Sequence, residues 1–160
     1  MANYYFQVLT AHQAIFDGTF KLTTSACTTG TYANGMLVEP DYTVSPPVLV
    51  LSGASGSPIG QLNERRALIY FPQDEFLIGA DQGGKYTNIV TGYYEALCGP
   101  DLFSAGAVPT VGAKLYTAAS GLIGVSGTTA IGICIRTETV QRSTGAFNAA
   151  RCRFNLTQII

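Results

Sequence analysis

The clearest alternation of apolar and polar positions lies near the C-terminal end of the chain. From Arg151 to Leu156, the apolar residues Cys152, Phe154 and Leu156 alternate with arginine and asparagine. A period of two is typical of a strand with one buried face. The pattern predicts a strand over Ala150–Leu156 whose arginines face outward.

The other apolar stretches are short and are separated by glycine- and proline-containing turns. Asn34-Gly35 predicts a type I′ hairpin turn, and Gln61–Ala67 is the best candidate for a short helical turn. We therefore expect an all-β fold, a small β-barrel or β-sandwich of about ten short strands with at most one short helical turn. The predicted strands besides the last are Tyr4–Leu9, Phe20–Thr24, Met36–Val38, Val48–Leu51, Ala67–Phe71, Phe76–Ile78, Tyr86–Cys98, Lys114–Thr117, Leu122–Val125 and Ala130–Thr137.

A length of 160 residues fits one domain. The sequence predicts an N-terminal arm over residues 1–18, followed by a single β domain over residues 19–160. Tyr4, Tyr5 and Phe6 give the arm an aromatic character. Aromatic side chains bury a large area at a low cost in entropy, so these three are candidates for contact with a capsid or with a neighbouring subunit.

Ionised residues are sparse for a soluble domain. Only 12% of the residues are charged, against 47% hydrophobic, and the net charge is −1. This composition excludes a disordered chain and leaves two interpretations. In the first, neutral polar residues cover the surface. In the second, which we favour, much of the surface is buried in an assembly of subunits.

The charges are also divided unevenly along the chain. Residues 1–110 carry nine acidic and four basic residues, whereas residues 111–160 carry five basic residues and one acidic residue. Such a division suits complementary faces that meet between subunits, or a contact with an acidic lattice such as a capsid. Arg142, Arg151 and Arg153 are the candidates for the basic side of such a contact. A pI of 5.7 argues against nucleic acid as a partner.

Nothing in the sequence predicts a membrane or secreted protein. The longest apolar run, Ala67–Phe71, is too short to span a bilayer. A secretory signal requires a basic residue near its start, and no lysine or arginine precedes Lys21. Four cysteines occur without a Cys-x-x-Cys pair, and His12 is the single histidine. We therefore expect no metal site and reduced cysteines inside the core.

Three segments resemble catalytic motifs but lack a required part. Gly79–Lys85 matches the start of a P-loop, yet Tyr86 replaces the residue that binds magnesium and a strand is predicted in place of a helix. Gly53–Ser57 lacks the second glycine of a nucleophile elbow. Asp74-Glu75 is an adjacent pair whose carboxylates point apart. We expect no enzyme activity, no catalytic residue and no cofactor.

Segments in both halves of the chain resemble the head decoration (cement) proteins of tailed phages. Val111–Tyr116, Ala119–Ile123 and Ala130–Cys134 are similar to that family's strand–turn–strand pattern, and Asn34–Val38 to its earlier hairpin strand. Cys134 departs from the pattern, because the family more often has alanine there. The resemblance implies a small β domain, often trimeric, that binds outside an icosahedral head and stabilises it against the pressure of the packaged DNA. It transfers no binding residue to this chain.

The resulting hypothesis is a structural virion protein, made in the host cytoplasm and located on the capsid exterior. Its partners would be further copies of itself, as a trimer, and the major capsid protein. One alternative is a ring-forming tail-tube or connector component. Another is a carbohydrate- or receptor-binding β-sandwich that uses Tyr93, Tyr94 and Tyr116.

Overall fold

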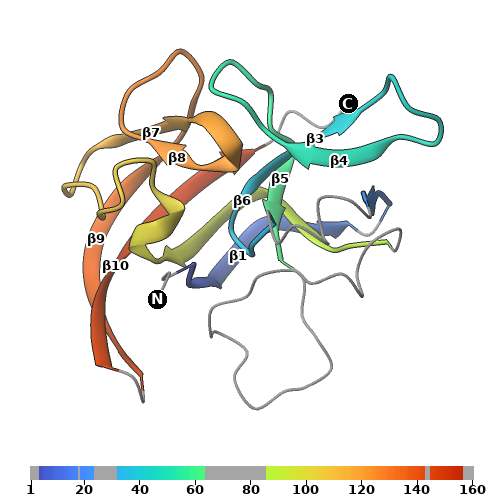
Figure 1. The fold of residues 1–160 in the computed structure, drawn as a ribbon. Helices are drawn as coiled ribbons and strands as arrows, with labels where there is room; N and C mark the ends of the chain where they lie inside the picture. The colour runs from blue at the N-terminus through green and yellow to red at the C-terminus, as the bar shows by residue number, and fades with distance from the viewer. Residues whose placement is uncertain (1–3, 18, 24–31, 64–85, 143–144, 157–160) are drawn as a thin grey trace.

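The computed structural model describes residues 4–17, 19–23, 32–63, 86–142 and 145–156. These residues form ten strands in one sheet and no α-helix, which confirms the all-β prediction (Figure 1). The strands are β1 (Phe6–Asp17), β2 (Lys21–Leu22), β3 (Leu37–Asp41), β4 (Val48–Leu51), β5 (Gly60–Leu62), β6 (Ile89–Cys98), β7 (Lys114–Thr117), β8 (Ile123–Gly124), β9 (Ala130–Arg142) and β10 (Gly145–Leu156).

Strand β6 is the centre of the sheet. Antiparallel β1 pairs with it from Ile89 to Cys98, and the opposite edge of β6 is shared by β5 and β10. The partner changes at Gly92, whose positive φ of 91° suits glycine. From this point the sheet continues as β5-β3-β4-β2 on one side and as β10-β9-β7-β8 on the other. The two halves enclose one core.

Aromatic residues from neighbouring strands fill this core. Tyr94 of β6 lies opposite Phe154 of β10, with ring centroids 5.4 Å apart, and both side chains are fully buried. The Tyr94 hydroxyl donates a hydrogen bond to Gln61 Oε1, and Gln61 Nε2 donates to the Gly35 carbonyl at 2.7 Å. This buried chain of polar groups joins β6 and β5 to the turn that precedes β3.

Two local predictions need correction. Asn34 and Gly35 do form a turn, closed by a 3.2 Å bond from Met36 N–H to the Ala33 carbonyl. Only Gly35 of the two has a positive φ, so the turn is not of type I′. Gln61 and Leu62 of the predicted helical turn Gln61–Ala67 lie in β5, and residues 64–67 lie outside the described residues. Within the described ranges, 3₁₀ turns lie at Pro100–Leu102 and Ala119–Gly121. The predicted strands Ala67–Phe71 and Phe76–Ile78 lie outside the described residues.

The N-terminal segment is a strand of the main sheet. β1 pairs with β6 over ten residues, with irregularities between Val8 and Thr10 and between Ala11 and Gln13. The predicted division into an arm and a domain therefore does not match the sheet, because backbone pairing along β6 joins this segment to the body. The side chains of residues 10–17 are outside the described part of the structure.

Candidate interaction surface

The outer face of β6, β10 and β9 carries most of the charged contacts that the structure describes. On β10, Cys152, Phe154 and Leu156 are buried in the core, while Arg153 and Asn155 are exposed on the other face. The alternation predicted from the sequence is thus confirmed. It places Arg151 and Arg153 side by side on this outer face.

Glu95 of β6 binds both arginines. Arg153 is its direct partner in the β6–β10 register and donates to Oε1 from Nη2 at 2.9 Å. Arg151 donates to Oε2 from Nη2 at 2.8 Å and from Nε at 3.1 Å. The Glu95 side chain is only 9% exposed. The bonds from Arg153 and Arg151 lower the pKa of this carboxyl, so it is ionised at neutral pH.

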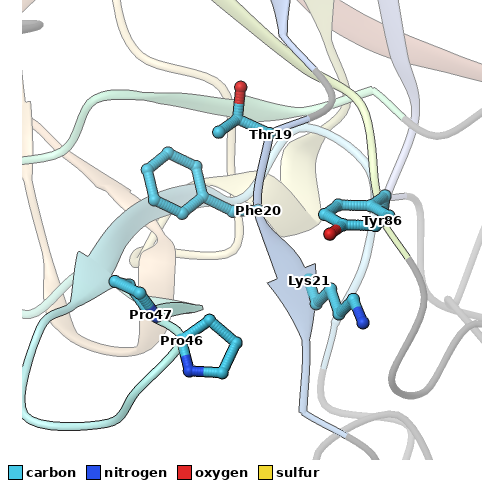
Figure 2. A pocket seen from close by; sticks show the side chains of 6 residues that line it. All are labelled: Thr19, Phe20, Lys21, Pro46, Pro47 and Tyr86. Atoms are coloured by element: carbon cyan, nitrogen blue, oxygen red, sulfur yellow. The ribbon is translucent and has the colours of Figure 1, made fainter.

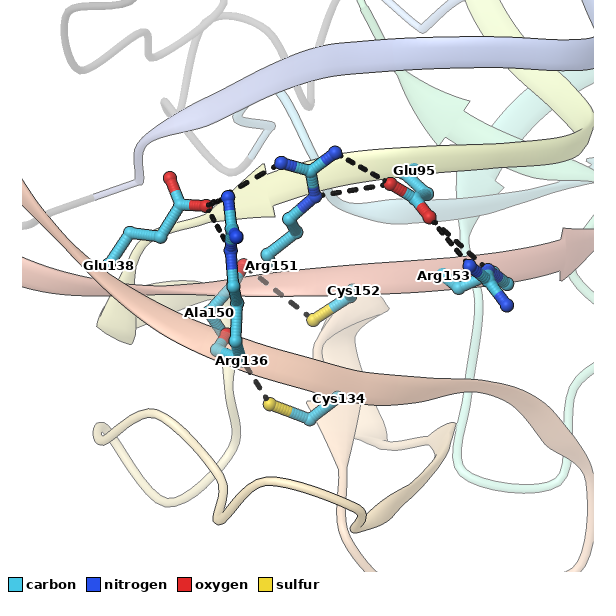
Figure 3. A network of polar contacts seen from close by, with 8 residues as sticks. All are labelled: Glu95, Cys134, Arg136, Glu138, Ala150, Arg151, Cys152 and Arg153. Atoms are coloured by element: carbon cyan, nitrogen blue, oxygen red, sulfur yellow. Dashed lines mark hydrogen bonds and ion pairs between the residues drawn. The ribbon is translucent and has the colours of Figure 1, made fainter.

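A second carboxylate extends the contacts to β9. Glu138 Oε1 lies 2.6 Å from Arg136 Nη2 and 3.6 Å from Arg151 Nη1 (Figure 3). Three guanidinium groups and two carboxylates therefore form one network across three strands, and Arg151 is shared between both carboxylates. We call these five residues the Glu95 network; its members are Glu95, Arg136, Glu138, Arg151 and Arg153.

Two of the arginines predicted as a contact set, Arg151 and Arg153, thus already form ion pairs within the chain. Arg151 is 25% exposed and Arg153 is 45% exposed at the side chain. Both remain able to donate outward, because an arginine has five N–H donors. Arg142 ends β9, and its side chain is outside what the structure describes.

The predicted aromatic contact residues point into the molecule. Phe6 belongs to the main core, and half-buried Tyr4 packs against it. Tyr5 lies on the opposite face, where it packs with Leu97 and Ala149 and meets the Phe147 ring edge-on at 5.5 Å. Tyr5 and Phe6 are each 6% exposed, so neither offers an accessible surface to a partner. The prediction that they form a projecting contact is corrected in this respect, because they bury their rings within the chain.

A two-stranded ribbon projects beyond these residues, at the lower left of Figure 1. It consists of Thr137–Arg142 of β9 and Gly145–Ala149 of β10, which we call the β9–β10 ribbon. Within the described residues these segments pair only with each other, since β6 reaches β10 from Ala150 onward and β7 reaches β9 no further than Ile133. Among its residues whose side chains are described, the exposed ones are uncharged, namely Thr137, Thr139, Gln141, Ala146 and Asn148, while Glu138 is half-buried within the Glu95 network. The sequence does not predict the ribbon, because these positions lack an apolar alternation.

The three tyrosines of the carbohydrate-binding alternative do not form one platform. Tyr94 is fully buried, and its neighbour Tyr93 points to the other face of β6. Tyr116 lies half-buried on β7, which pairs with β9 and not with β6. Tyr94 therefore cannot stack on a ligand, and the set as predicted is not assembled.

Three of the four cysteines form a row across the core side of the same strands. Cys98, Cys134 and Cys152 are free and buried, as the sequence predicts, and Cys27 lies outside the described residues. A hydrogen bond with Cys152 and burial raise the pKa of Cys134. The bond from Cys134 lowers the pKa of Cys152, but its bond with Cys98 and its burial outweigh this, so the net shift is upward. Both groups are therefore neutral thiols.

The segments that resemble catalytic motifs provide no assembled site in the described structure. Gly79–Lys85 lies outside the described residues, and Gly53–Ser57 is an exposed turn whose Ser57 N–H donates to Glu39 at 3.0 Å. Within the described ranges, no group of three histidine, cysteine or acidic residues is arranged to hold a metal ion. The same ranges include no helix of the length and apolar character that crossing a membrane requires.

Comparisons of the chain with protein-family models, with curated proteins and with solved structures give no match.

Proposed function

We propose that this chain is a structural subunit of a virion, a decoration protein that binds the outside of a phage head as a homotrimer and stabilises it. The observation that carries the proposal is the β9–β10 ribbon. It extends two strands past the body of the sheet. Its exposed side chains, among those that the structure describes, are threonine, glutamine, asparagine and alanine, and its acidic residue Glu138 is half-buried. A two-stranded ribbon alone is only marginally stable in water, so a neighbouring surface that covers it adds stability.

The ribbon also has open backbone edges. Among the described residues, the outward N–H and C=O groups of Thr137–Gln141 and Gly145–Ala149 have no strand beside them. Proteins that avoid strand pairing protect such edges with charges or prolines. None of the exposed ribbon residues whose side chains the structure describes is charged or a proline. The low overall charge supports the same conclusion, because self-repulsion between copies is weak.

The Glu95 network supplies a polar rim to the same face. Arg153 and Arg136 keep roughly half of their side chains exposed, and both stand on strands that continue into the ribbon. A projecting segment whose exposed, described side chains are neutral, bordered by partly exposed arginines, matches the usual division of an interface into a core and a polar rim. Many identical copies on a closed shell would then multiply a modest contact by avidity.

The test is the particle size of the full chain and its location. Light scattering and mass photometry of the purified protein are expected to give a trimer. Thr139→Asp, which places a charge on the exposed face of the ribbon, is expected to shift the particles toward monomer. Ser55→Asp, at an exposed position in the loop after β4, is the matched control and is expected to leave the trimer intact.

Location is tested on virions purified from the source of the protein. The proposal expects the chain in intact particles by mass spectrometry, with its surface accessible to antibody on heads that retain their DNA. A monomer at every concentration together with absence from virions would overturn it. Five-, six- or twelve-fold rings would replace it with the tail-tube or connector alternative.

A further inference from the structure

A cavity at the opposite end of the molecule from the ribbon contributes to none of the surfaces described above. It has a volume of about 330 Å³ and is lined by Thr19, Phe20, Lys21, Pro46, Pro47 and Tyr86 (Figure 2). That volume lies at the lower end of the range for small-molecule sites. The cavity is therefore large enough for one ring-sized molecule and too small for a folded partner.

Backbone pairing on both sides of β2 holds the lining in place. Lys21 and Leu22 of β2 pair in parallel with Val48 and Leu49 of β4, the strand that begins directly after the two prolines. On the other side of β2, Lys21 forms a bridge with Tyr86, and Thr87 N–H donates to the Phe20 carbonyl at 3.0 Å. The site is preformed by these contacts, so a ligand would not have to order it.

The lining residues are mostly apolar, and one of them is charged. Two aromatic rings and two proline rings provide the walls, and Tyr86 is 63% exposed. The only ionised group among the lining residues is the Lys21 ammonium, which lies 4.9 Å from the centre of the Tyr86 ring. This cation–π contact positions the ammonium at the wall, and no carboxylate of a described residue pairs with it.

We propose that this cavity binds a small ring-shaped molecule that carries one carboxylate. The ring lies against the faces of Tyr86 and the prolines, and the carboxylate pairs with the Lys21 ammonium. The lining residues include no acidic or amide side chain, so the carboxylate and the faces of the ring, and not ring hydroxyls, carry the recognition. Two sources share the proposed chemistry, an aromatic carboxylate and a uronic acid. This inference goes beyond assembly and does not depend on it.

The experiment is a titration of the full-length protein followed by amide NMR and calorimetry. The probes are benzoate, glucuronate, and the neutral compounds benzyl alcohol and glucose. We expect saturable shifts centred on Thr19–Leu22 and Tyr86–Thr87 with at least one of the two carboxylates, and affinity at least about tenfold weaker for its neutral counterpart. Whether benzoate or glucuronate binds more tightly identifies the source.

Variants assign the binding to this cavity. Lys21→Met keeps the aliphatic stem and removes the charge, so it should weaken carboxylate binding about tenfold while leaving the weak binding of the neutral ring unchanged. Tyr86→Ala should weaken both. Tyr42→Ala is the matched control, since Tyr42 is 69% exposed and does not line the cavity.

Amide spectra of each variant verify the fold before binding is compared. Equal affinity for the charged and neutral probes would overturn the proposal. It would likewise be overturned by shifts that map elsewhere, or by no saturable binding of either carboxylate. None of these results bears on the trimer, whose test is particle size.

Discussion

Glu95 on β6 lies directly opposite Arg153 on β10, and its two carboxylate oxygens are divided between Arg153 and Arg151. Each arginine thus has its own oxygen to bind, so the two guanidinium groups do not compete for one acceptor. The carboxylate is almost covered, whereas Arg153 keeps a side exposed to solvent. Glu95 therefore neutralises charge that would otherwise accumulate on one face of β10.

Removing the Glu95 charge is expected to destabilise the fold. Glu95→Gln keeps the size of the side chain but leaves two arginines beside each other without their anion. We expect a loss of about 1–2 kcal/mol in the free energy of unfolding, measured by urea denaturation. Glu138→Gln is the matched control, because its partner Arg136 is largely exposed and its loss should cost under about 0.5 kcal/mol. Equal effects of the two substitutions would contradict the central role of Glu95.

The same carboxylate predicts a dependence of stability on pH. The pKa of Glu95 is lower in the folded chain than in the unfolded chain, because Arg153 and Arg151 favour its ionised form. The contribution of the Glu95 charge to stability is therefore complete above the pKa of this group in the unfolded chain, about 4.3. It is lost as the pH falls through the pKa of the folded chain. The stability difference between wild type and Glu95→Gln should be constant from about pH 6 to pH 8 and shrink below about pH 4.5. A difference that grows on acidification would contradict this assignment.

The partner of the arginines could not be identified from sequence alone. Arg151 and Arg153 are separated from Glu95 by more than fifty residues, and only the register of β6 against β10 brings them together. A signal was present, because Glu95 is an acidic residue inside an otherwise uncharged strand from Ile89 to Cys98. Choosing its partner among the basic residues required the strand pairing, which local patterns do not determine.

Strands with one buried face were predicted well, and strands outside the core were not. Lys114–Thr117 matches β7, and the predicted Ala150–Leu156 covers the half of β10 that packs on β6. Both β9 and β10 continue past their predicted ends into the ribbon. There the more buried face includes Glu138 beside Val140, so burial alternates but the apolar pattern does not. The N-terminal segment is predicted as an arm for a different reason, because its pairing with β6 is a contact between distant parts of the sequence.

The Tyr94 hydroxyl provides a test of the buried polar chain in the core. Burial raises the pKa of this phenol well above its ordinary value, so it is a neutral donor to Gln61 Oε1. Tyr94→Phe would leave that oxygen buried without its donor. We expect a loss of about 1–3 kcal/mol in the free energy of unfolding. Tyr42→Phe, at an exposed position, should change it by less than about 0.5 kcal/mol.

The buried cysteines are expected to be unreactive in the folded protein. Thiolate is the reactive form, and the pKa values of Cys134 and Cys152 are both shifted upward on balance, so both thiols stay protonated. Iodoacetamide at pH 8 followed by peptide mass spectrometry should leave Cys98, Cys134 and Cys152 unmodified in native protein and modify all three in urea. Rapid labelling of any of them under native conditions would show that the row opens to solvent.

The base of the ribbon offers the sharpest test of how the N-terminal strand supports it. Tyr5 packs on Phe147, Leu97 and Ala149, where the β9–β10 ribbon leaves the body. Tyr5→Ala removes the largest side chain of this small cluster without entering the main core. Amide hydrogen exchange should therefore accelerate by about tenfold or more across Thr137–Ala149, while the amides of β6 and of Arg151–Leu156 change little. Tyr4→Ala is the control, because Tyr4 packs against the main core and not against the ribbon. If Tyr5→Ala accelerates exchange evenly over the whole sheet, the ribbon is not a separately opening unit and its stability derives from the body as a whole.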